Sequence, residues 1–125
     1  MIRAVLVTHG SLGQSLCEAA ISVLGPQEGV TVLSNSGLSL DQIQERVLAA
    51  LTTDPTVIMV DLCGGSPFMA CCSLTGLPAQ CAVVSGINLP MLLSFLTKRS
   101  QLTLTELADT VARDAVRGIQ SRPSV

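Results

Sequence analysis

The feature that most constrains the fold is a set of short apolar runs separated by longer segments with helical spacing. Residues 2–7 and 56–60 are apolar almost throughout and rich in β-branched side chains, and residues 30–33 and 82–84 form two further short runs. Apolar runs of this length without polar alternation are typical of strands buried on both faces of a sheet. Such a sheet needs a helical layer on each side.

The intervening segments supply the helices. Their apolar residues recur every three or four positions, and two of them open with a capping box, in which a Ser or Thr is followed three residues later by Gln or Glu. The predicted helix starts lie near Gly13, Ser39, Ser66, Asn88 and Thr103, with Ser66 as an N-cap before Pro67. Strand and helix alternate, so residues 1–125 are predicted to form one α/β domain with an open, mainly parallel sheet and helices on both faces.

Composition excludes several function classes. Only 13% of the 125 residues are charged and the formal net charge is -2, with no basic patch for nucleic acid. Two Phe and no Trp or Tyr leave no stacking platform for a single strand. No apolar run approaches the roughly 18–20 residues of a membrane-spanning helix. Five cysteines without C-x-x-C spacing predict reduced thiols in the cytoplasm and no metal site.

Polar residues follow the predicted strands where ligands bind in open α/β sheets, beyond the carboxyl ends. The first strand leads into His9, the third into Asp61, and the fourth into a turn that contains Gly86 and Asn88. If the first and third strands are neighbours, His9 and Asp61 converge at one edge of the sheet.

His9 is the one histidine of the chain. It is either a structural residue or a base, metal ligand or nucleophile at the mouth of a loop. Asp61 is either a cap or turn residue or a carboxylate that orients the ring by accepting the proton of one ring nitrogen.

Gly64 and Gly65 precede Ser66 at the start of a predicted helix. The segment is either a plain turn or an anion cradle, in which glycine N–H groups and the Ser66 hydroxyl contact a phosphate. A nucleophilic imidazole, an orienting carboxylate and a cradle together predict phosphoryl transfer through a phosphohistidine at His9.

Two other protein classes place a His-Gly pair after the first strand. Histidine phosphatases need an Arg before that histidine and a second histidine, whereas here Thr8 precedes His9. Small tetrapyrrole metal chelatases need further His or acidic ligands. The single histidine counts against both classes, and the chelatase alternative predicts tetrapyrrole binding at His9.

Three motifs carry a family resemblance over essentially the whole chain. They are Val7-Thr-His-Gly10, Asp61 with Gly64-Gly-Ser-Pro-Phe68, and Gly86-Ile-Asn-Leu-Pro-Met91. In order and spacing the sequence resembles the IIA component of the mannose-type sugar phosphotransferase system (PTS).

The resemblance implies a sheet in the order 2-1-3-4, plus an antiparallel edge strand exchanged between the subunits of a homodimer. It also implies a cytoplasmic phosphotransferase component that needs no cofactor and contacts the membrane only through a permease complex. In this family, phospho-HPr phosphorylates the histidine, here His9, which passes the group to a IIB component. Because no IIB-like segment follows residue 125, we expect the acceptor to be a separate chain.

The resemblance also assigns roles to residues. Asp61 becomes the carboxylate that orients His9, and the expected phosphate contacts are Gly10, Gly64, Gly65 and Ser66. The expected rim of the site consists of Leu62, Cys63, Gly86 and Asn88. Gly86 and Asn88 either shape the loop at this rim or are a plain turn and an N-cap. Leu62 and Cys63 depart from the family, because members such as the mannose transporter subunit have Thr-Trp there.

Two questions stay open at this point. The same chemistry at His9 serves either sugar transport or a regulatory phosphoprotein that signals without transport. Transfer between proteins favours a small, weak interface. Leu12, Leu62, Phe68 and Met91 either supply that interface or belong to the core.

Overall fold

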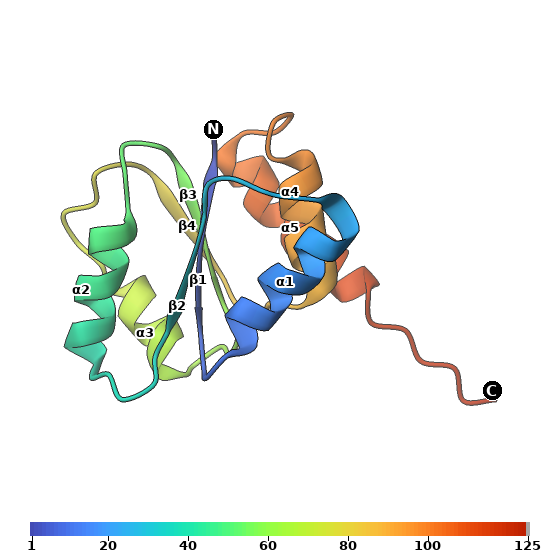
Figure 1. Ribbon diagram of the computed structural model, residues 1–125, viewed down its shortest axis with the longest axis horizontal. Helices are drawn as coiled ribbons and strands as arrows, with labels where there is room; N and C mark the ends of the chain where they lie inside the picture. The colour runs from blue at the N-terminus through green and yellow to red at the C-terminus, as the bar shows by residue number, and fades with distance from the viewer. Residues whose placement is uncertain (125) are drawn as a thin grey trace.

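Four parallel strands in the order β2-β1-β3-β4 form the centre of the computed structural model, which describes residues 1–124 (Figure 1). The predicted strand order is confirmed. The strands are β1 (Arg3–Thr8), β2 (Val30–Ser34), β3 (Thr56–Val60) and β4 (Cys81–Val84). The helices are α1 (Leu12–Leu24), α2 (Leu40–Ala50), α3 (Ser66–Cys72), α4 (Leu89–Lys98) and α5 (Leu104–Arg117). Val125, the last residue of the predicted domain, lies outside the described residues.

The helices cover both faces of the sheet. Helices α1, α4 and α5 lie on one side, and α2 and α3 lie on the other (Figure 1). Side chains alternate along a strand, so Leu6 joins the core under α1, α4 and α5 while Val5 joins the core under α2 and α3. Every residue of β3 is therefore buried, and the predicted burial on both faces is confirmed.

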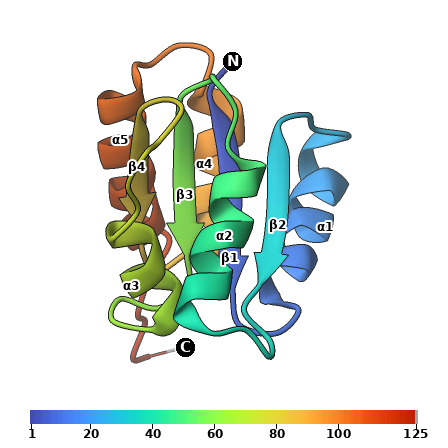
Figure 2. The same cartoon turned by 90° about the vertical axis from the view of Figure 1, so that its left-hand side faces the viewer.

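All four strands run in the same direction, so their carboxyl ends meet at one edge (Figure 2). This edge is the lower one in Figure 2, and it holds the loops that lead into α1, α2, α3 and α4. The parallel topology thus collects loops from across the sequence in one place.

One sequence-based expectation was wrong, and another is not seen within a single chain. Residues 1–124 contain no antiparallel edge strand, so β2 and β4 are the two edges of the sheet. The expected exchange of an edge strand between subunits stays a prediction, and residues 120–124 extend away from the sheet (Figure 1). Ser66 is not an N-cap, because the Met69 N–H donates to the carbonyl of Gly65, which caps α3 instead.

The other predicted helix starts are confirmed. Ser39 and Thr103 each form a complete capping box with the residue three positions later. Asn88 caps α4 by accepting from the Met91 N–H. Within the described residues, no helix is both long enough and apolar enough to cross a bilayer.

We predict that Phe95→Ala lowers the free energy of unfolding by about 3–5 kcal/mol, because Phe95 is fully buried between α4 and the sheet and its removal leaves a cavity. Urea denaturation measures this change. Val116→Ala on α5 is the control: its side chain is 68% exposed, and its effect should stay within about 0.5 kcal/mol. Equal losses in the two variants would contradict the assigned core.

Candidate functional site

His9 and Asp61 lie side by side because β1 and β3 are neighbouring strands. Val7 pairs with Val60 in the sheet, and His9 and Asp61 follow just beyond the ends of these strands. The convergence expected for neighbouring first and third strands is therefore observed.

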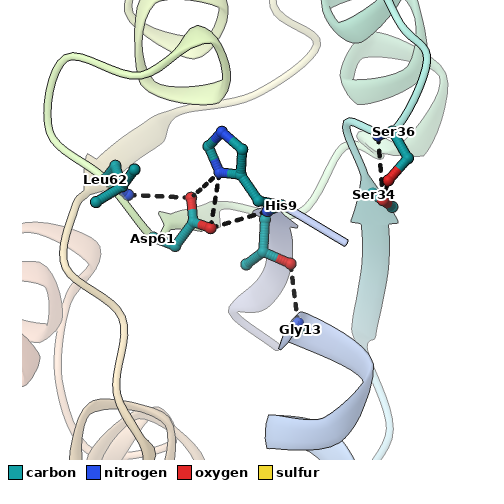
Figure 3. A network of polar contacts seen from close by, with 7 residues as sticks. His9, Gly13, Ser34, Ser36, Asp61 and Leu62 are labelled. Atoms are coloured by element: carbon teal, nitrogen blue, oxygen red, sulfur yellow. Dashed lines mark hydrogen bonds and ion pairs between the residues drawn. The ribbon is translucent and has the colours of Figure 1, made fainter. Parts of the chain in front are cut away.

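The carboxylate of Asp61 receives hydrogen bonds from two parts of His9 (Figure 3). Ring Nδ1 lies 2.9 Å from Oδ2 and 3.1 Å from Oδ1, and the backbone N–H of His9 donates to Oδ2 at 2.8 Å. The N–H of Leu62 donates to Oδ1 at 3.0 Å. A carboxylate only accepts hydrogen bonds, so Nδ1 carries the proton and Nε2 of the neutral ring keeps its lone pair.

The two side chains of the pair differ in solvent exposure. The Asp61 side chain is only 9% exposed, whereas that of His9 is 46% exposed. Burial acts to raise the pKa of Asp61, but the hydrogen bonds from the backbone and ring of His9 outweigh it and hold the pKa below its ordinary value. Asp61 is thus a shielded, ionised hydrogen-bond acceptor, and the ring that it holds is half-exposed.

Glycines shape the loops around the ring. A Cβ on Gly65 would lie 3.4 Å from Cε1 of His9, so the 64–66 loop passes close beside the imidazole. Gly64 has a φ of 89° and Gly10 a φ of 56°, values that L side chains rarely adopt. Ser66, the first residue of α3, is exposed in the same loop.

The residues expected at the rim divide into two groups. Leu62 and Cys63 are exposed between Asp61 and Gly64. The side-chain amide of Asn88 instead links α4 to α5. Its Oδ1 accepts from the N–H of Met91 in α4, and its Nδ2 donates to the carbonyl of Ala115 in α5 at 3.1 Å. Gly86 forms a turn with a φ of 76°.

The apolar residues considered for a partner surface also divide. Leu12 and Leu62 are exposed, and Phe68 is half-buried against the core under α2 and α3. Met91 is only 1% exposed, because it points from the first turn of α4 into the core. As a surface residue, Met91 was therefore a wrong candidate.

Sequence reasoning missed two features beside His9. Thr8 is fully buried, and its hydroxyl oxygen accepts from the N–H of Gly13. The polar turn after β2 places Ser34 and Ser36 near the same edge, and its Asn35 N–H donates to the carbonyl of Thr8. The Ser-Asn-Ser-Gly sequence after the second strand was the available signal for this turn.

A protein-family comparison identifies the chain. Residues 3–112 match the family model EIIA-man, described as the PTS system fructose IIA component. The chain belongs to this family.

Within residues 1–124, no group of three His, Cys, Asp or Glu side chains is arranged to hold a metal ion.

Individual relatives agree with this membership. The chain is 29% identical to the mannose-specific EIIAB component of Escherichia coli over 98% of its own length, but it spans only 41% of that relative. It is 28% identical to the fructose-specific EIIA component of Bacillus subtilis, covering 89% of this chain and 80% of the relative. The crystal structure of the phosphotransferase component EIIA from Streptococcus agalactiae superposes with a TM-score of 0.89 at 25% identity, covering 97% of each chain.

We predict that Asp61 makes stability depend on pH. Because its folded-state pKa is lowered, its ionised form stabilises the fold above the ordinary carboxyl pKa, and this contribution is lost as pH falls through the folded-state value. In urea denaturation from about pH 7 to about pH 2, Asp61→Asn should be less stable than wild type at neutral pH, and the gap should close in acid. The control is Asp109→Asn, which removes an exposed carboxylate on α5 and should change the free energy of unfolding by no more than about 0.5 kcal/mol. A constant gap for Asp61→Asn would contradict the ionised acceptor.

Proposed function

We propose that this protein carries a phosphoryl group, accepting it from phospho-HPr on Nε2 of His9 and passing it to a IIB component. The observation that carries the proposal is the half-exposed His9 ring, whose Nδ1 is held by a shielded carboxylate. Membership of the PTS IIA family supports the same chemistry.

The transfer is a displacement at phosphorus. The Nε2 lone pair of His9 forms a bond to phosphorus while the bond between phosphorus and the donor breaks, and that electron pair leaves with the donor. The Nδ1 proton stays in place, because it is already hydrogen-bonded to Asp61. Asp61 then stabilises the positive charge that develops on the ring, and the reverse displacement delivers the group to the acceptor.

The phosphoryl oxygens would be held by the two glycine loops beside the ring. We assign these contacts to Gly10, Gly64, Gly65 and Ser66, through backbone N–H groups and the Ser66 hydroxyl. The close passage of Gly65 at the ring edge and the exposure of Ser66 support this assignment. Backbone N–H groups fixed in place by the fold would need little reorganisation when negative charge arrives.

Partner proteins would meet the chain at the exposed edge around His9. Leu12 and Leu62 offer apolar contact there, with Cys63 in the loop beside Leu62. We also propose a homodimer formed along β4, an edge strand whose four residues are all half-exposed. The five free thiols suit the cytoplasm, which keeps cysteines reduced.

The test is intact mass after incubation with phosphoenolpyruvate, enzyme I and HPr. Wild type should gain one phosphate, about 80 Da, in an acid-labile form. His9→Ala should gain nothing, because His9 is the only histidine. Phosphate uptake by His9→Ala at the wild-type level, or none by folded wild type with phosphorylated HPr, would sink the proposal.

The role of Asp61 gives a second prediction. Asp61→Ala should still accept phosphate, but at least about tenfold more slowly, because the nucleophile remains while its orientation and charge partner are lost. Rapid-quench mass spectrometry follows the rate. Asp109→Ala removes an exposed carboxylate on α5 and should react at the wild-type rate. A wild-type rate in Asp61→Ala would remove Asp61 from the site.

A further inference from the structure

We infer that Thr8 is a positioning residue for the phosphoryl acceptor: its buried hydroxyl fixes helix α1 to the end of β1 and so holds His9 in register with Asp61. This inference rests on the proposed function of His9. Thr8 touches neither reacting atom, so its role would be exerted through the backbone of its neighbour.

Thr8 performs the capping that α1 lacks at its own N-cap. The first N–H groups of a helix have no partner within the helix. Ser11 stands at the N-cap of α1 but makes no side-chain hydrogen bond there. The Gly13 N–H instead donates at 2.8 Å to Oγ1 of Thr8, a residue at the end of the neighbouring strand with no exposed surface. This hydrogen bond thus joins α1 to the end of β1 at the residue directly before His9.

The joint requires close approach. A Cβ on Gly13 would lie 2.8 Å from Oγ1 of Thr8 and 3.0 Å from Cγ1 of Val32, so a larger residue would push α1 away from the sheet. The carbonyl of Thr8 also accepts from the Asn35 N–H at 3.0 Å. Thr8 is therefore fixed by contacts to the start of α1 and to the turn after β2, in addition to its place in β1.

The constraint on Thr8 also restricts the backbone of His9, the next residue. The backbone N–H of His9 donates to Asp61, and its carbonyl accepts from the N–H of Leu12, the first residue of α1. His9 is thus held between Asp61 on one side and α1 on the other. If the joint at Thr8 is lost, the start of α1 can shift, and the Nδ1 contact to Asp61 loses its fixed geometry. The proton would then no longer be restricted to Nδ1.

The experiment compares Thr8→Val, which keeps the shape and removes the oxygen, with Thr8→Ser, which keeps the oxygen. Thr56→Val is the matched control, because Thr56 is also buried, donates its hydroxyl to the carbonyl of Asp54, and lies at the opposite end of the sheet. Nitrogen-15 NMR of the single imidazole, on protein without a histidine tag, reports the tautomer. Phosphorylation by phosphoramidate reports the rate without any partner protein.

We expect Thr8→Val to show a mixed tautomer and to react about tenfold more slowly, since small misplacements of a reacting group are costly. Thr8→Ser should stay within about threefold of wild type. Thr56→Val should match wild type in tautomer and rate even where its melting temperature falls. If Thr8→Val behaves like Thr56→Val, losing stability alone, the inference is overturned.

A variant on the helix side keeps the test decisive if Thr8→Val does not fold. Gly13→Ala leaves every hydrogen-bonding group in place but forces its methyl against the Thr8 oxygen. It should show the same mixed tautomer and slower reaction, and wild-type behaviour would contradict the inference. Failure of wild type to accept phosphate from phosphoramidate or phospho-HPr would instead reject the proposed function, while the tautomer comparison would still decide the role of Thr8.

Discussion

Burial of β1 and β3 on both faces is the constraint from which the rest of the structure follows. Strands with no polar face need cover on each side, and the helices in the crossover connections between these parallel strands supply it. Parallel strands then end at one edge, where the chain leaves the core and can present polar groups. His9 and Asp61 are 52 positions apart in sequence, and this topology makes them neighbours.

The pairing of His9 with Asp61 uses the backbone as well as the side chain. A carboxylate that accepted only the ring proton would restrain the imidazole but would not fix the backbone of the residue that carries it. Asp61 also accepts the N–H of His9, so one carboxylate fixes both the position of the residue and the tautomer of its ring. Its burial carries a desolvation penalty, which these hydrogen bonds offset.

The sequence predicted most of the fold because its signals were local. The apolar runs, the two capping boxes and Asn88 each depend on residues within a few positions, and all of them appear in the structure. The pairing of Thr8 with Gly13 escaped notice because it crosses between two elements, and no periodicity marks a strand residue that caps a helix. The N-cap of α3 was predicted one residue too late, at Ser66, because Gly65 has no side chain that would mark it as an N-cap. Met91 looked available for a partner because burial depends on how α4 packs.

The departure at Leu62 and Cys63 fits this geometry. Asp61 is held by the N–H of Leu62, and any residue other than proline supplies that group. Leu62 and Cys63 are both exposed, whereas the Asp61 side chain is shielded. The two side chains therefore contribute to the exposed edge and do not take part in the hydrogen bonds between His9 and Asp61. The loop can therefore carry Leu-Cys, where the family resemblance led us to expect Thr-Trp, and keep Asp61 as the hydrogen-bond acceptor of His9. Under the proposed function, the exchange would alter the surface that a partner meets and leave the histidine–carboxylate pair unchanged.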